Sequence, residues 1–171
     1  MTEESTHEQV RQLALRYAEA VDARDLDALM ECFVHDVQVG RDQVGRDALR
    51  AWFDQVLRTF GVSIHFVGNH RITVLDDDHA EGVVYCRAEH GAPVGDPDGH
   101  GWFVMMIQYW DTYERVDGRW YFRRRKEKVW YGVHQEPSPA GELMDRWPGR
   151  DPRVAALPGD WPTWQAFWSR A

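Results

Sequence analysis

The stretch WFVMMIQYWDTYERVDGRWYFRRRKEKVWY, residues 102–131, consists of two long segments rich in aromatic and β-branched residues. Between them, residues 116–119 (VDGR) contain the Asp-Gly pair that is typical of a tight hairpin turn. Trp102–Arg115 and Trp120–Tyr131 are therefore predicted to be paired antiparallel strands. Both are long for strands of a globular protein, which indicates a strongly curved sheet.

In the segment before this hairpin, apolar and polar residues also alternate with a period of two. Val62–Leu75 and Ala80–Glu89 are predicted to be strands joined by a turn at Asp76–Asp78. Residues 91–101 are dense in Gly, Pro and Asp, so they are predicted to be a loop. The part of the chain up to Tyr131 thus ends in a meander of long strands.

Three helical segments precede this meander. Ser5 is expected to be the N-cap of a first helix that ends near Asp22, and Asp25 the N-cap of a second helix. Arg46–Phe60 has apolar residues at helical spacing and is predicted to be the third. Helices segregated from an antiparallel sheet indicate an α+β fold, here a cone with an internal pocket closed by the three N-terminal helices.

The segment after residue 134 has a different composition, because six prolines interrupt it. Trp161, Trp164 and Trp168 are spaced as one face of a short helix. We therefore divide the chain into a cone domain, residues 1–134, and a Pro/Trp-rich tail, residues 135–171. The tryptophans could close the mouth of the cone, pack as core or form a subunit interface.

Charge argues against a nucleic-acid-binding protein. The chain of 171 residues has 20 Lys and Arg against 28 Asp and Glu, a net charge of −8, whereas a nucleic-acid-binding face is basic. The basic run Arg123–Lys126 lies in a predicted strand, where side chains alternate between the two faces. No nucleic-acid partner is expected.

Cysteine spacing and hydropathy argue against a metal site, a disulfide framework, a secretory signal and a membrane span. Cys32 and Cys86 have neither CxxC nor Cys/His spacing, so no disulfide framework, metal site or metal cofactor is expected. Residues 1–6 are polar and acidic, unlike a secretory signal. No apolar run approaches the roughly 18 residues that span a membrane. The protein is therefore expected to be cytoplasmic and not to interact with a membrane.

Four segments resemble, in the same order, motifs of the SnoaL-like, or nuclear transport factor 2-like, superfamily: residues 16–29 (RYAEAVDARDLDAL), 45–53 (GRDALRAWF), 63–69 (SIHFVGN) and 117–122 (DGRWYF). The resemblance covers about residues 7–132. It implies a cone fold that holds a small, largely apolar molecule in a closed pocket. It also implies a homo-oligomer, a dimer or a trimer, as is common for this fold.

Within the superfamily, the chain most resembles a group of lyases: scytalone dehydratase, bile acid 7α-dehydratase and hexachlorocyclohexane dehydrochlorinase. These enzymes use an Asp on the first helix and a His on the following strand, which Asp22 and His65 match. Tyr17 matches a tyrosine of the bile acid enzyme, and Arg125 matches the pocket arginine of the dehydrochlorinase. The arginine of the bile acid enzyme falls on Val129, so that match fails.

The residue types fit this chemistry. Asp22 lies near the end of its helix, where the helix dipole disfavours a negative charge, so its carboxylate needs a partner. An Asp bonded to one nitrogen of His65 would fix the tautomer and make the other nitrogen a general base. Tyr17 could polarise a carbonyl or protonate a leaving group, and Arg125 could hold a leaving anion or a carboxylate.

Each of these residues also has a structural interpretation. Asp22 can cap or link helices, and His65 can be a strand residue with its hydrogen bonds satisfied. Tyr17 can belong to the core, and Arg125 to a solvated strand face. The candidates for lining the pocket, each of which can equally be a core residue, are Phe53, Val67, Tyr85, Met105 and Trp130.

The sequence gives less indication of a functional role for the other histidines. His70 could reach a pocket rim, but no residue pairs with it in the sequence. No function is assigned to the remaining ones near turns, loops and the tail: His35, His79, His90, His100 and His134.

The hypothesis that follows is a cofactor-free lyase, of dehydratase or dehydrohalogenase type, with an Asp22–His65 base and a small apolar substrate. An isomerase or polyketide-type cyclase would need the same base. A ligand-binding protein, or a noncatalytic partner such as the small subunit of a ring-hydroxylating dioxygenase, is the alternative outside catalysis, because one fold supports many functions.

Overall fold

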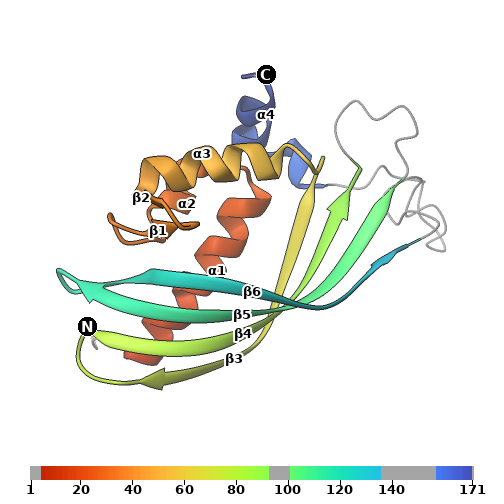
Figure 1. The fold of residues 1–171 in the computed structure, drawn as a ribbon. Coiled ribbons are helices and arrows are strands. Elements are labelled where there is room, and N and C mark those ends of the chain that lie inside the picture. Colours follow the sequence, from red (N-terminus) through yellow and green to blue (C-terminus); the bar gives the residue numbers. More distant parts are fainter. Residues whose placement is uncertain (1–4, 93–100, 136–156, 171) are drawn as a thin grey trace.

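The structure is a computed structural model that describes residues 5–92, 101–135 and 157–170. Its main sheet is antiparallel and consists, in spatial order, of β3 (Ser63–Val74), β4 (His79–Gly91), β5 (Trp102–Val116) and β6 (Arg119–His134). Figure 1 shows that all four strands bend along their length. The meander predicted from the period of two residues is therefore confirmed, with strand ends within three residues of those expected.

Irregular pairing accompanies the curvature. The register shifts between Val67 and His70 of β3, and β5 pairs with β6 with shifts at Met106/Ile107 and at Thr112/Tyr113. An extra residue in one strand bends it and increases its twist. The long strands therefore wrap around the helices instead of forming a flat sheet.

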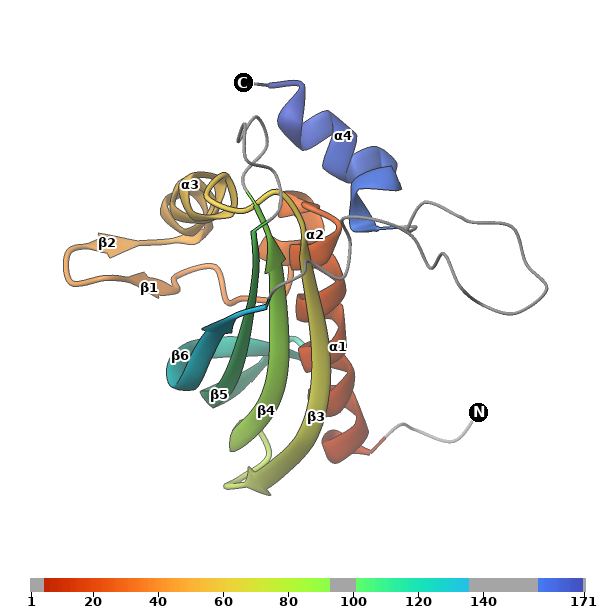
Figure 2. The ribbon, with the colours of Figure 1, turned by 90° about the vertical axis from the view of Figure 1, so that its right-hand side faces the viewer.

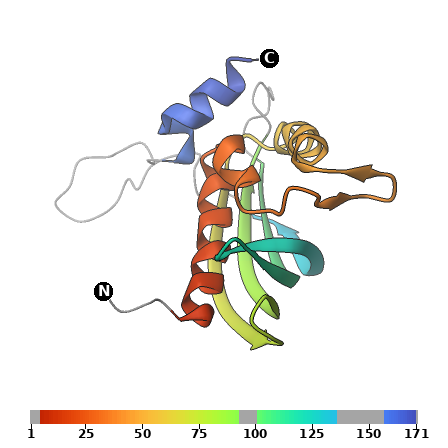
Figure 3. The same cartoon turned by 90° about the vertical axis from the view of Figure 1, so that its left-hand side faces the viewer.

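The helices α1 (Thr6–Asp22), α2 (Leu26–Met30) and α3 (Arg46–Leu57) precede the sheet, as predicted. Ser5 caps α1 by accepting a hydrogen bond from the Glu8 backbone N–H, and Asp25 caps α2 in the same way through Ala28. Figures 2 and 3 show α1 running along the sheet next to β3, with α3 across one end. This arrangement is the α+β cone expected from the sequence.

Two features of the fold were not predicted. Residues Gln38–Val39 (β1) and Gln43–Val44 (β2) form a small hairpin before α3. The end of α2 is tied to β6 by a parallel bridge between Phe33 and Phe122. Strands of two residues show no periodic pattern, so a reading of hydropathy cannot find them.

The C-terminal helix α4 (Pro162–Trp168) follows a 3-10 turn at Pro158–Asp160 and brings the described helices to four. It lies at the same end of the fold as α3 (Figure 1). Phe167 is its buried residue, and Trp164 donates a hydrogen bond from Nε1 to the Gly61 carbonyl at 3.0 Å. Trp161 is 41% exposed, so the tryptophans do not form one buried stripe.

The core lies between α1 and the concave face of the sheet, and Tyr17 is at its centre. Its ring makes edge contacts with four other rings at centroid distances of 5.8–6.3 Å: Phe33, Phe53, Tyr109 and Phe122. None of the described helices is long and apolar enough to cross a membrane.

Candidate functional site

The structure brings Asp22 and His65 together at the junction of α1 and β3. Asp22 Oδ1 lies 2.6 Å from His65 Nδ1, and Asp22 Oδ2 accepts a hydrogen bond from the His65 backbone N–H at 2.8 Å. The two side chains are only 10% and 7% exposed. Because a backbone amide can only donate, both carboxylate oxygens are used as acceptors. The carboxylate therefore fixes the position of the imidazole ring.

Arg24 also stabilises the junction of α1 and β3. It turns the chain after α1 with a positive φ of 55°, and its guanidinium donates to the Val21 carbonyl and to Ser63 Oγ, both at 2.7 Å. Burial lowers the pKa of Arg24 to about 10, whereas the nearby Asp22 carboxylate opposes this change. Arg24 is therefore charged at neutral pH and links the end of α1 to the first residue of β3.

His65 lines a cavity of about 280 Å³ between α1, α3 and the concave face of the sheet. The lining is mainly apolar and aromatic: Tyr17, Val21, Trp52, Phe53, Val56, Leu57, Phe60, Ser63, His65, Ala88, His90, Met105, Ile107, Tyr109 and Glu127. Small-molecule sites commonly combine such a lining with a few polar groups. Of the pair Asp22 and His65, here called the dyad, His65 lines this cavity and Asp22 holds it without being a lining residue.

Tyr17 also lines this cavity, although its ring belongs to the aromatic core. Burial raises the pKa of Tyr17 to about 12, and the nearby Arg125 opposes this rise. The Arg125 guanidinium lies 4.2 Å from the centre of the Tyr17 ring. A phenol can both donate and accept a hydrogen bond, so the Tyr17 O–H can serve as a donor to a molecule in the cavity.

Arg125 is placed differently from Tyr17. It is not among the residues that line the cavity, because Asp111 holds it with two hydrogen bonds, of 2.9 and 2.7 Å. The guanidinium lies 4.1–4.2 Å from the ring centres of Tyr17, Tyr109 and Phe122. Its side chain is 7% exposed, so the interpretation of a solvated strand face is wrong. Arg125 therefore acts on the His65 cavity through its contacts with Tyr17 and Tyr109, and itself lines a separate hollow beside Phe33 and Leu49.

A β-bulge in β6 explains why Arg125 is buried and does not lie on a solvated strand face. Phe122 pairs with Tyr113 and Arg125 pairs with Asp111, so β6 has one more residue than β5 between these pairs. Phe122 and Arg125 therefore both point into the core, although they are an odd number of positions apart. The extra residue lets Arg123 bind Glu114 at 2.6 Å.

His90 is the cavity residue that sequence reasoning passed over. It is 8% exposed, its ring centre lies 6.1 Å from that of His65, and its Nδ1 has no hydrogen-bond partner among the described residues. Burial, together with the proximity of His65, lowers the pKa of His90 to about 4. A neutral imidazole thus faces the same space as the dyad.

The buried histidines give the protein a pH-dependent stability. Burial also lowers the pKa of His70 to about 4, from the usual 6.5. Between pH 4 and pH 6.5 the unfolded chain binds more protons than the folded chain. The contribution of these histidines to the free energy of unfolding is therefore fully present above pH 6.5 and is lost as the pH falls toward 4. We expect a lower urea midpoint at about pH 4.5 than at about pH 7, and a smaller difference in His90→Gln.

The exposed His35 provides the matched control for this experiment. His35→Gln should keep the full pH dependence, because it removes a histidine that is not buried. If His90→Gln retained the same pH dependence as His35→Gln, burial of His90 would not be its cause.

The predicted lining residues divide into two groups. Phe53 and Met105 line the cavity, and Val67 packs against the core without lining it. Tyr85 and Trp130 are wrong as cavity residues, because they pack against each other at a centroid distance of 4.8 Å outside the lining. Tyr85 lies between the buried Val84 and Cys86, so its side chain points to the opposite face of the sheet.

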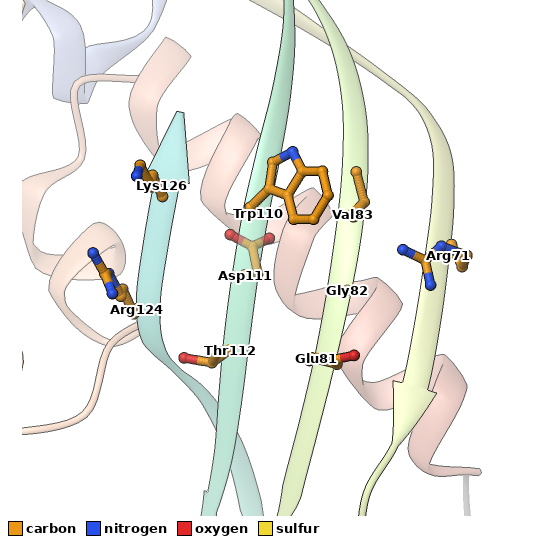
Figure 4. Close-up of a pocket in the computed structure, with 9 residues that line it drawn as sticks. All are labelled: Arg71, Glu81, Gly82, Val83, Trp110, Asp111, Thr112, Arg124 and Lys126. Carbon is orange, nitrogen blue, oxygen red and sulfur yellow. The ribbon is translucent and has the colours of Figure 1, made fainter. Parts of the chain in front are cut away.

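That opposite face has a hollow of its own, of about 210 Å³ (Figure 4). It is lined by charged and polar side chains around Trp110, among them Arg71, Glu81, Arg124 and Lys126. Figure 4 shows the Asp111 carboxylate on the other side of β5, toward α1. The hollow contains neither residue of the dyad, so the cavity at His65 is the candidate site. In the described part of the chain, no three His, Cys, Asp or Glu residues are grouped to hold a metal ion.

Comparison with known proteins places this chain in a family. The SnoaL-like domain matches residues 3–126, which is most of the chain. The uncharacterised protein Rv2910c of Mycobacterium tuberculosis is 28% identical over 124 residues, which cover 70% of this chain and 82% of that protein.

Solved structures with the same fold include proteins named as lyases. A scytalone dehydratase-like protein from Novosphingobium aromaticivorans has a TM-score of 0.63 and 22% identity, covering 75% of this chain and 87% of that one. The hexachlorocyclohexane dehydrochlorinase LinA-type3 from Novosphingobium barchaimii has a TM-score of 0.66 and 18% identity, covering 77% and 90%. At sequence identities of about 20%, these similarities show that the proteins share a fold.

Proposed function

The chain belongs to the SnoaL-like domain family, and we propose that it is a cofactor-free lyase that removes water or a hydrogen halide from a small apolar molecule. His65 acts as the general base, Asp22 holds it, and Tyr17 assists the leaving group. Neighbours of the same fold that are named as a dehydrochlorinase and as scytalone dehydratase-like support the type of reaction.

The observation that carries this proposal is that both carboxylate oxygens of Asp22 contact His65. Asp22 Oδ2 accepts from the backbone N–H of His65, and Oδ1 lies 2.6 Å from Nδ1 of the same residue. Because an ionised carboxylate can only accept, it favours the tautomer with the proton on Nδ1, which leaves Nε2 with a free electron pair. His65 lines the cavity, so this nitrogen is the base available to a bound molecule.

The reaction needs one proton transfer to the protein. Nε2 of His65 takes a proton from carbon, the electrons of the C–H bond form a C=C bond, and the leaving group departs with its own electron pair. The Asp22 carboxylate stabilises the imidazolium that forms. General base catalysis of this kind contributes roughly 10²–10⁴-fold to the rate.

Tyr17 supplies the proton that a departing hydroxide needs. Its raised pKa, about 12, keeps the phenol protonated throughout the neutral range. The positive charge of Arg125, 4.2 Å from the Tyr17 ring centre, stabilises the phenolate that forms when the proton leaves. Return of the proton from His65 to Tyr17 through solvent completes the cycle. A halide leaves as an anion and does not need this step.

The test is product analysis with defined probes. Wild-type protein and His65→Gln are incubated with two kinds of probe. With hexachlorocyclohexane, the release of chloride is measured. With cyclic β-hydroxy ketones, the mass of the product is measured by mass spectrometry. We expect the wild type to release chloride or water from at least one probe and His65→Gln to be at least about 10²-fold slower. His35→Gln is the control, because His35 is exposed and is not among the residues that line the cavity.

Other outcomes decide against the lyase. A product of unchanged mass would indicate an isomerase or a polyketide-type cyclase that uses the same base. Binding without turnover in both wild type and His65→Gln would indicate a ligand-binding or partner protein. Full activity of His65→Gln would remove the dyad from the mechanism.

A further inference from the structure

Glu127 is the unexplained charged group of the cavity. It pairs with Tyr109 in the register of β5 and β6, so the two side chains lie on the same concave face. Among the described residues that line the cavity, none is Lys or Arg, and Glu127 is the only carboxylate. It is exposed, as is Trp52, so both lie on the open side of the cavity.

The neighbouring cations do not neutralise this carboxylate. Lys126 and Lys128 alternate with Glu127 and lie on the other face, where Lys128 Nζ is 3.9 Å from the Trp110 ring centre. Arg125 shares the face of Glu127, but Asp111 occupies its guanidinium. In the described part of the chain, no hydrogen bond or ion pair involves Glu127.

The field of Glu127 extends into the site. Burial is the main cause of the raised pKa of Tyr17 and of Tyr109, which both line the cavity, and the charge of Glu127 adds to the rise while that of Arg125 opposes it. The Asp22 charge lies behind His65, and the neutral His90 adds no positive charge. Arg24 offsets the charge of Asp22, and Asp111 offsets that of Arg125. Glu127 is therefore the charge without a counter-ion in the lining, and the potential is most negative at the open side.

We propose that Glu127 selects the substrate by charge: the cavity takes a neutral or cationic molecule with a hydroxyl or ammonium group at Glu127, and disfavours carboxylates. This deepens the proposed function, because it describes the substrate class of the same site. The reacting carbon would face His65, and the donor group would face the open side. A carboxylate in that position would meet Glu127 with no cation in the lining to bind it.

Binding of three probes that share one ring tests the charge preference without requiring turnover. Benzylamine in its protonated form, benzyl alcohol and benzoate are titrated into wild type by calorimetry at low salt. We expect benzylamine to bind more tightly than benzoate. In Glu127→Gln, benzylamine should bind about fivefold more weakly, benzoate about fivefold more tightly and benzyl alcohol within about twofold, as for a unit charge near 4 Å in water. Added salt should reduce the preference.

Glu81→Gln is the matched control, because it removes the same charge from the opposite face of the sheet (Figure 4). It should leave all three affinities unchanged. The proposal is overturned if Glu127→Gln behaves like Glu81→Gln, if all three affinities shift together, or if wild type binds benzoate as tightly as benzylamine or binds no probe. Failure of the lyase proposal would instead appear as absent turnover with the charge preference intact.

Discussion

Asp22→Asn is expected to lower turnover by about 10³–10⁴-fold while the protein remains folded. The reason is the backbone N–H of His65, which donates to one Asp22 oxygen at 2.8 Å. In the variant the only side-chain oxygen must stay at this donor, so the amide NH₂ faces Nδ1. Nδ1 then becomes an acceptor, and the imidazole proton moves to Nε2. The nitrogen that faces the cavity loses the electron pair that it needs as a base.

Steady-state kinetics on the probe that wild type turns over would measure this loss. Glu19→Gln is the control, because it removes a carboxylate from the exposed side of the same helix. It should leave the rate unchanged. A rate for Asp22→Asn within about tenfold of wild type would show that the tautomer of His65 does not limit the reaction.

Asp111→Ala is expected to destabilise the protein by about 3–5 kcal/mol, the usual cost of breaking a buried ion pair on one side. The Asp111 side chain is 0% exposed and holds Arg125 through two hydrogen bonds, and it also accepts from the Tyr113 hydroxyl at 2.9 Å. Without it, a guanidinium enclosed by three aromatic rings would be left without a counter-charge. Urea unfolding monitored by circular dichroism measures the change.

Two further variants separate this cause from a general loss of packing. Asp111→Ala combined with Arg125→Met removes both charges, so it should recover part of the lost stability. Asp54→Ala breaks the half-exposed pair with Arg58, and should cost less than about 1 kcal/mol. A double variant no more stable than Asp111→Ala would contradict the role given to the unpaired charge.

Most of the fold could be predicted from the sequence because its strongest patterns are long. The four strands and the caps at Ser5 and Asp25 follow from periodicity over many residues and from local capping chemistry. The β1–β2 hairpin could not be predicted, since its strands are two residues long. The pairing of Asp22 with His65 rested on the resemblance, because they are 43 positions apart and no local pattern joins them.

The residues that sequence reasoning missed depend on contacts between distant elements. Arg24 lies in the polar run DARD, which is typical of a solvated turn, and becomes buried only when β3 packs against the end of α1. Asp111 meets Arg125 because of a bulge in β6, which no alternation rule locates. His90 precedes a glycine-rich stretch of sequence, and the register of β3 and β4, in which Ser63 pairs with His90 and His65 with Ala88, brings its ring toward His65.

The oligomeric state stays a prediction of the family resemblance. Phe66 is 72% exposed on β3 and Trp130 is 49% exposed on β6, so apolar side chains of the sheet remain accessible in the single chain.

The tautomer of His65 is the direct measurement of the central claim, that Asp22 turns Nε2 into a base facing the cavity. Nitrogen-15 NMR of protein labelled at its histidines, at a pH where the ring is neutral, distinguishes a protonated ring nitrogen from an unprotonated one. The expected result is a proton on Nδ1 and none on Nε2 in wild type, with the two exchanged in Asp22→Asn. A wild-type ring that carries its proton on Nε2 would contradict the account, because Nε2 could then accept no proton from a substrate.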